Sequence, residues 1–226
     1  MPPLAVVDSR ILDIRQFDMS SLFFTDTKIF NNLWLEESTL SICERIFAGT
    51  LLLILSPVMI VVAALVKITM DGDVFYTQTR VGKYGRNFSI IKFRSMIENA
   101  EASTGPVLAT ENDPRITRLG NILRKSHLDE LPQLINVLRG EMSFVGPRPE
   151  RPNFVDVYDA EIDQYSRRKE VKPGITGLAQ ICLPYDATAN DKLSYDLFYI
   201  DRRKSLVFNL MISYYTAKKM VTFYQS

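Results

Sequence analysis

The chain has 226 residues, 46% of them hydrophobic, which suits one or two domains with a sizeable core. Its 27 basic and 26 acidic residues leave a net charge of +1, so the whole-chain charge indicates no single class of partner. His127 is the only histidine and the two cysteines, Cys43 and Cys182, lack metal-ligand spacing, which argues against a histidine or cysteine metal site and against a Ser-His-Asp triad.

Residues 1–41 form the first predicted segment, because they show no strong hydrophobic period. Residues 1–44 carry seven acidic and three basic side chains. We expect short helices and loops that cover a membrane surface. We expect no cleavable signal peptide, so the two cysteines indicate free thiols in a reducing compartment.

An apolar run follows, residues 46–66, with no charged residue in 21 positions. At about 1.5 Å per residue, a helix of this length crosses a hydrocarbon core of about 30 Å. Ser56-Pro57 at its centre predicts a bend or a break, because proline lacks an N–H and clashes with the preceding turn. These residues alone favour a kinked spanning helix, since transmembrane helices tolerate proline. A re-entrant hairpin and a buried core helix remain open alternatives.

Residues 73–96 predict a β-hairpin, because the β-rich runs VFYTQ and FSIIKF flank Tyr84-Gly85. Residues 77–94 carry five basic and no acidic side chains, so the hairpin loop is basic. A second basic block, residues 114–125, carries four basic and no acidic side chains. Such blocks favour an anionic ligand, although a solvated surface has the same composition.

Three helices are predicted in the middle of the chain. A polar helix begins at Met96, and a loop then leads into a short helix that ends near Lys125. A further helix follows from Leu131, because apolar residues recur there with a helical period. Gly140 is a suitable stop for it.

The segment SHLDELPQL, residues 126–134, places Asp129 and Glu130 side by side. In a structural interpretation, Asp129 caps a helix that starts at Glu130. In a functional interpretation, the preceding Arg124 and Lys125 and the helix N-terminus hold a phosphate. The two carboxylates would then hold a divalent cation, or one of them would attack phosphorus.

The segment SFVGPRPERP, residues 143–152, is predicted to lack regular structure because of its three prolines. Pro147 and Pro149 would stiffen the loop and hold Arg148, whose guanidinium can bind two phosphate oxygens, while a plain surface turn is the alternative. Residues 171–181, VKPGITGLAQI, indicate a turn-rich connection. A C-terminal helix over residues 205–226 would lie on a membrane or pack on its own domain.

Three of these stretches resemble one known family: QTRVGKYGRNFSIIKFRSM, RITRLGNILRKSHLDELPQLINVLRGEMSFVGPRPE and VKPGITGLAQI. The family is the bacterial sugar transferases, or monotopic polyprenyl-phosphate phosphoglycosyl transferases, and the likeness extends to the subgroup of exopolysaccharide export. The resemblance covers about residues 42–220. It implies a mostly helical, monotopic α/β fold with a small sheet. Residues 42–70 would form a re-entrant membrane helix broken at Ser56-Pro57, residues 71–204 a cytosolic catalytic domain, and residues 205–226 an interfacial helix.

The resemblance also implies a reaction. Sugar 1-phosphate would move from a nucleotide diphosphate sugar, usually a UDP-sugar, to undecaprenyl phosphate at the cytoplasmic face of the bacterial inner membrane, with release of UMP. Asp129 would be the nucleophile and would carry a covalent phosphosugar. Glu130, with Asp129, would hold Mg²⁺.

The same resemblance assigns roles to four basic residues. Arg124 would grip phosphate, and Arg148, between Pro147 and Pro149, would contact the nucleotide. Lys92 and Arg94 would contact phosphate or form structural ion pairs.

Two stretches depart from the family pattern. The membrane helix opens with Glu44-Arg45 and then Ala48, where the family usually has Lys-Arg and Asp. After Gln180 the chain continues ICLPYDATAND, without the arginine that many members have there. The residue that replaces this arginine and the sugar that is used are therefore not carried over.

Other functions are weighed against this one. A non-catalytic membrane scaffold that binds a nucleotide sugar is the alternative, and the intact Asp129-Glu130 pair argues against it. A basic nucleic-acid-binding module rests on the charge blocks alone, so we expect no nucleic-acid partner. Membrane lipid is an expected partner, and the sequence leaves a homodimer open.

Overall fold

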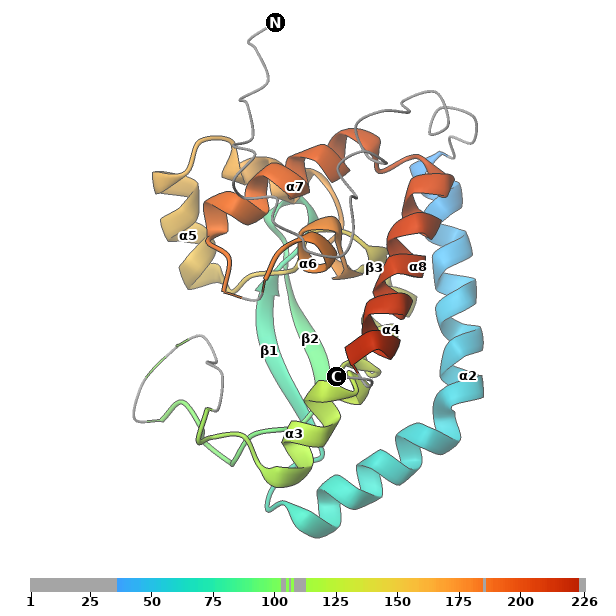
Figure 1. Ribbon diagram of the computed structural model, residues 1–226, viewed down its shortest axis with the longest axis vertical. Helices are drawn as coiled ribbons and strands as arrows, with labels where there is room; N and C mark the ends of the chain where they lie inside the picture. Colours follow the sequence, from blue (N-terminus) through green and yellow to red (C-terminus); the bar gives the residue numbers. More distant parts are fainter. Residues whose placement is uncertain (1–35, 103–104, 106, 108–112, 185, 224–226) are drawn as a thin grey trace, which may run out of the picture.

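The computed structural model describes residues 36–102, 105, 107, 113–184 and 186–223. It is mostly helical, with two small sheets (Figure 1). In chain order the elements are α2 (Glu37–Thr69), β1 (Phe75–Val81), η2 (Lys83–Gly85), β2 (Asn87–Phe93), α3 (Arg118–Lys125), η3 (Leu128–Glu130), α4 (Gln133–Arg139), β3 (Ser143–Val145), α5 (Pro152–Glu161), η4 (Tyr165–Glu170), β4 (Gly174–Thr176), α6 (Leu178–Cys182), α7 (Ala189–Arg202) and α8 (Leu206–Phe223).

The predicted surface segment, residues 1–41, falls almost wholly outside the described residues. Its last part is helical, because α2 already begins at Glu37. The boundary with the apolar helix therefore lies earlier than predicted.

Helix α2 has 33 residues and is the one described helix that is long and apolar enough to cross a membrane. Pro57 lies inside it, and the helix bends near its middle (Figure 1). Proline has no N–H to offer to the carbonyl four residues earlier, at Leu53. The hydroxyl of Ser56 donates to that carbonyl instead, at 2.8 Å. The disruption predicted at Ser56-Pro57 is thus a bend within one continuous helix.

Strands β1 and β2 form the predicted hairpin. They pair antiparallel, from Phe75 opposite Phe93 to Val81 opposite Asn87. The turn at η2 places both Tyr84 and Gly85 in the left-handed region, at φ 58° and 73°. The sheet has two strands, so the outer edge of β2 has no strand beside it in the described structure.

Two other predicted segments need correction. The polar helix expected from Met96 is absent from the described residues, where Met96 instead forms a β-bridge with Ile116. Residues 143–152 were expected to be irregular, yet Ser143–Val145 is β3 and pairs parallel with β4. Pro152 opens α5, a position where its missing N–H costs no hydrogen bond.

The predicted helix after Leu131 is confirmed as α4, and Gly140 ends it in the left-handed region, at φ 81°. Helix α3 confirms the short basic helix. Its N-cap is Thr117, whose hydroxyl accepts a hydrogen bond from Gly120 N.

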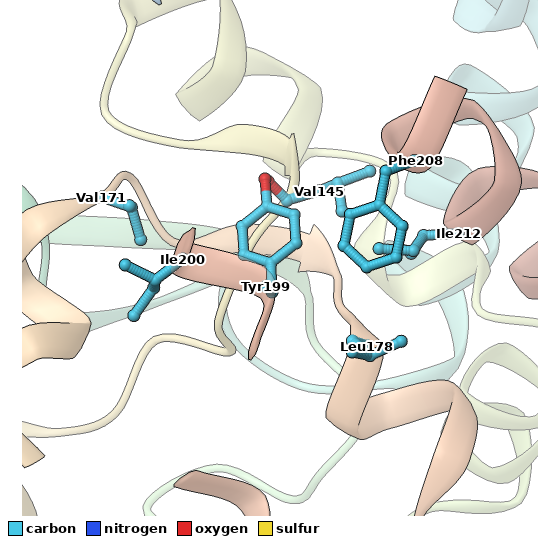
Figure 2. Close-up of a cluster of buried hydrophobic side chains, with 7 residues drawn as sticks. All are labelled: Val145, Val171, Leu178, Tyr199, Ile200, Phe208 and Ile212. Atoms are coloured by element: carbon cyan, nitrogen blue, oxygen red, sulfur yellow. The ribbon is translucent and has the colours of Figure 1, made fainter. Parts of the chain in front are cut away.

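The C-terminal half of the domain is built on a cluster of buried side chains, drawn in Figure 2: Val145, Val171, Leu178, Tyr199, Ile200, Phe208 and Ile212. The Tyr199 hydroxyl points toward β3 and donates to the carbonyl of Val145 at 2.8 Å. Phe208 and Ile212 bring one face of α8 into this cluster, so α8 packs on its own domain. Leu210 and Tyr214 remain exposed on it.

Two further core clusters include side chains of α2. Ala48 packs with Ile90 and with Leu134 and Val137 of α4. Val62 and Val66 pack with Phe93 and Leu123. The apolar helix therefore lies along one side of the domain and packs against it through both limbs, as Figure 1 shows.

Candidate active site

Asp129 and Glu130 lie in a tight turn between two helices. Helix α3 ends at Lys125, and His127 adopts a left-handed conformation, at φ 55°, that redirects the chain. The turn η3 follows, and α4 begins only at Gln133, after Pro132. The predicted N-cap role of Asp129 is therefore wrong: Pro132 occupies the N-cap of α4, with no side-chain cap.

The turn is anchored on the apolar helix. Leu128 and Leu131, on either side of the two acids, pack against the cluster that contains Val62 and Val66 of α2. This packing fixes the position of the acidic pair next to the C-terminal limb of the apolar helix.

Glu130 is held by two cations. Its Oε1 accepts a hydrogen bond from Lys92 Nζ at 2.7 Å and from Arg148 Nη2 at 3.1 Å. The Lys92 and Glu130 side chains are 17% and 14% exposed, so this pair is largely removed from water. Burial penalises the charged form of Glu130, but Lys92 and Arg148 outweigh it and hold its pKa well below the usual range.

Asp129 has the opposite electrostatic setting. It is 7% exposed, and its Oδ1 is buried without a hydrogen-bond partner in the described structure. Burial raises its pKa to about 6, with Glu130 adding to the rise and Lys92 and Arg124 opposing it. A buried carboxylate oxygen without a hydrogen bond is poorly stabilised as an anion, which favours its reaction with an electrophile.

Arg148 lies in the loop at residues 146–149, between two prolines. Pro147 and Pro149 are buried, while the side chain of Arg148 is 44% exposed. Gly174 N donates to the carbonyl of Pro147 at 3.0 Å, so β4 supports the loop. Gly146 has no room for a side chain, because a Cβ would lie 2.5 Å from the carbonyl oxygen of Lys172.

Two arginines that the sequence analysis missed hold the same loop. Arg80 Nη1 donates to the carbonyl of Pro149 at 3.0 Å, and Arg168 Nη2 donates to the carbonyl of Arg148 at 2.7 Å. Arg168 also pairs with the buried Asp196 at 2.9 Å and lies over the ring of Tyr165. No local motif marks these residues, since their partners are far away in the sequence.

The remaining predicted residues divide into two groups. Arg124 lies in the last turn of α3, and its charge opposes the rise in the pKa of Asp129, so it lies near the acidic pair. Arg94 Nη1 donates to the carbonyl of Asp71 at 2.7 Å, in the turn that follows α2. Arg94 therefore has a structural contact and is not brought to the acidic pair.

A magnesium ion was also expected at this site. The described residues contain no group of three or more His, Cys, Asp or Glu side chains that would enclose a metal. Mg²⁺ is commonly held by one or two carboxylates together with waters and substrate phosphates. The unpaired Oδ1 of Asp129 fits that kind of open site, whereas Oε1 of Glu130 already accepts from Lys92 and Arg148.

Comparisons with known proteins agree with the resemblance. The family model described as bacterial sugar transferase matches residues 36–223. UDP-N-acetylgalactosamine-undecaprenyl-phosphate N-acetylgalactosaminephosphotransferase of Aeromonas hydrophila is 45% identical over 170 residues, 74% of this chain and 40% of the relative. UDP-glucose:undecaprenyl-phosphate glucose-1-phosphate transferase of Escherichia coli (strain K12) is 43% identical over 183 residues, 78% of this chain and 39% of the relative. Exopolysaccharide production protein ExoY of Rhizobium meliloti (strain 1021) is 38% identical over 183 residues, 75% of this chain and 79% of the relative. The chain thus spans about 40% of the length of the first two relatives.

Proposed function

We infer the function of this chain from the family to which it belongs, the bacterial sugar transferases. We propose that it transfers sugar 1-phosphate from a UDP-sugar to undecaprenyl phosphate, as the first membrane step in the synthesis of an exopolysaccharide or other glycoconjugate. The names of two relatives support both substrates, and the name of a third supports a role in exopolysaccharide production. The observation that carries the proposal is the buried Asp129, whose Oδ1 has no partner in the described structure, beside a Glu130 that is neutralised by Lys92 and Arg148.

In the first step, one oxygen of the Asp129 carboxylate attacks the phosphorus that carries the sugar. The bond between this phosphorus and the bridging oxygen of the diphosphate breaks, and UMP leaves with the electron pair. An acyl phosphate then links Asp129 to the sugar phosphate. Low solvation of Asp129 favours this step, because little hydration has to be removed from the attacking oxygen.

In the second step, an oxygen of undecaprenyl phosphate attacks the same phosphorus. The acyl phosphate bond breaks, and its electron pair returns to the Asp129 carboxylate. The product is undecaprenyl diphosphosugar, and the enzyme regains its starting form.

The cations around the acidic pair would bind and orient the phosphates. Arg148 is exposed and its backbone carbonyl accepts a hydrogen bond from Arg168, so we assign it to the nucleotide diphosphate, together with Arg124 in the last turn of α3. Lys92 is committed to Glu130 and holds that carboxylate in place. Mg²⁺, held by Asp129 and Glu130 with the substrate phosphates, would neutralise diphosphate charge.

The proposal includes a monotopic, re-entrant placement of α2. Its first limb is tied to the domain by polar bonds, since Arg45 Nε donates to the carbonyl of Leu138 at 2.8 Å and Lys172 Nζ donates to Ser41 Oγ at 2.6 Å. Its last limb packs against the same domain through Val62 and Val66. A helix that spans a bilayer would separate its ends by the thickness of the membrane, so contacts of both limbs with one domain support the re-entrant alternative.

The outer face of α2 supports contact with lipid. Leu53, Ile60 and Ile68 are 79%, 68% and 81% exposed on it. Apolar side chains exposed in such a row indicate a surface that lies in a membrane. We propose the cytoplasmic face of the bacterial inner membrane, where the lipid phosphate of the acceptor would reach Asp129 beside α2.

The nucleotide product tests the proposal. Purified protein in detergent would be incubated with Mg²⁺, undecaprenyl phosphate and a panel of UDP-sugars that includes UDP-glucose and UDP-N-acetylgalactosamine. We expect UMP from one donor, and no release from Asp129→Asn. Release of UDP would indicate transfer of the sugar without its phosphate and would overturn the roles of Asp129 and Arg148.

A further inference from the structure

Asn136 is a buried polar residue that the proposed chemistry does not use. It lies on α4, is 0% exposed, and uses its whole amide in hydrogen bonds. Oδ1 accepts from Ile91 N at 3.1 Å, while Nδ2 donates to the carbonyl of Ser89 at 2.8 Å and to Glu141 Oε2 at 2.7 Å. One donor opposite Oδ1 and two acceptors opposite Nδ2 define the orientation of the amide.

These bonds occupy the outer edge of β2. Strand β1 pairs with the other edge, and α4 lies beside the outer one (Figure 1). A residue of a neighbouring parallel strand bonds to the carbonyl of one residue and to the N–H of the residue two places later. The Asn136 amide makes the same pair of bonds, to Ser89 and Ile91, and thus substitutes for a missing strand.

This arrangement fixes the register of β2 against α4. Ile90 packs on Leu134 and Val137 of α4, but apolar contact is non-directional and does not define register by itself. Side chains two residues apart share a face of a strand, so Ile90 and Lys92 point to the same side. A slip of one residue would turn Lys92 to the opposite face, away from Glu130.

We propose that Asn136 is a positioning residue of the active site: its side-chain amide fixes the register of β2 so that Lys92 meets Glu130. This inference rests on the proposed function only for its effect on turnover. Its effect on the Lys92–Glu130 ion pair is independent of any activity.

The chain offers a matched control in Asn209. This residue is also buried, and its Nδ2 donates to the carbonyls of Arg203 and Ser205, at 2.8 and 2.9 Å, while its Oδ1 accepts from Tyr199. Asn136→Asp and Asn209→Asp each replace two donated hydrogen bonds by two contacts between acceptors. Only the first change acts on β2.

The first experiment is a double-mutant cycle on thermal stability with Lys92→Met, for each asparagine variant. If Asn136 acts through Lys92, Asn136→Asp and Lys92→Met will be non-additive in the shift of Tm, whereas Asn209→Asp and Lys92→Met will add. Additive shifts in both cycles would overturn the proposal. If Asn136→Asp does not fold, Glu141→Ala, which removes only the outer acceptor of the amide, replaces it in the same cycle.

The second experiment measures turnover at a temperature where all variants are folded. We expect Asn136→Asp to lower kcat at least about tenfold with a smaller change in KM, and Asn209→Asp to change kcat less than about twofold at a similar loss of Tm. Equal effects of the two variants on kcat would show a general structural role and overturn the proposal. A chain with no activity in any form would contradict the proposed function, while the stability cycle would still test the register.

Discussion

Lys92 donates a 2.7 Å hydrogen bond to Glu130, although 38 positions separate the two residues in the sequence. Lys92 is the last residue but one of β2, and Glu130 ends the turn η3, which packs against the apolar helix. Their contact therefore reports whether the hairpin, α4 and α2 are correctly assembled around the acidic pair.

Lys92→Met should lower the stability of the protein by about 1–3 kcal/mol, because Glu130 would stay buried with Arg148 as its remaining cation partner. Turnover should fall about 100-fold, because Glu130 would lose one of its two cation partners and its negative charge would repel the substrate phosphates more strongly. Thermal unfolding and UMP release measure the two effects. The double variant Lys92→Met, Glu130→Gln should regain stability but not turnover, and a single variant as stable as the parent would contradict the assigned ion pair.

The rate of phosphosugar–enzyme formation should rise with pH through about 6 and level off above it. The reason is that Asp129 attacks as the carboxylate and its pKa is raised to about 6, chiefly by burial. Rapid-quench measurement of UMP release without the lipid acceptor isolates this step. A rate that does not change between about pH 5 and about pH 8 would mean that the ionisation of Asp129 does not control the attack.

Asp129→Asn should stabilise the folded protein above pH 6. Burial raises the pKa of Asp129 from 3.8 to about 6, so the folded state binds the proton more tightly than the unfolded state does. The charged carboxylate therefore costs stability, up to roughly 3 kcal/mol, as pH rises from about 4 to about 7. The Tm difference between variant and parent should grow over this window and vanish below it; a constant difference across pH would contradict the burial effect.

Arg148→Lys should raise KM for the UDP-sugar about tenfold with a smaller effect on kcat, because lysine cannot bind two phosphate oxygens in one plane. Arg94→Lys is the matched control, since its guanidinium donates to the carbonyl of Asp71 after α2. Steady-state kinetics distinguish the two variants. A larger KM change for Arg94→Lys than for Arg148→Lys would reverse the assignment of these residues.

Cys43 offers a natural reporter of topology. It is exposed near the start of α2, whereas Cys182 is half-buried and burial raises the pKa of its thiol to about 12. A membrane-impermeant maleimide should label Cys43 in inverted vesicles, where the cytoplasmic face is outside, and not in sealed right-side-out vesicles. Cys43→Ser should abolish labelling. Labelling from the periplasmic side would favour a spanning α2.

Local signals in the sequence predicted several elements of this fold. The Tyr84-Gly85 pair between β-rich runs defined the hairpin, and the apolar period before Gly140 defined α4. The parallel pairing of β3 with β4 was missed, because both strands have three residues and meet across a long stretch of chain. The prediction that Asp129 caps a helix was wrong for a related reason, since the sequence does not reveal that Leu128 and Leu131 pack on α2.

The residues of the candidate site also divide into those that local sequence marks and those that only the fold brings to the site. Asp129, Glu130 and Arg148 were candidates from the sequence, because unusual charges and prolines cluster around them, and the family resemblance supplied their expected roles. Arg168, which donates to the carbonyl of Arg148, and Asn136, which bonds to β2, come from separate elements, and only the folded chain brings them into place.

The packing of α2 also bears on how the protein can be handled. Ala48, Val62 and Val66 complete two of the core clusters, so a fragment that starts after residue 70 would expose the apolar surfaces of Leu134, Val137, Phe93 and Leu123 to water. Such a fragment would aggregate instead of yielding a soluble enzyme. Helix α2 therefore has to be kept in any fragment that is intended to fold.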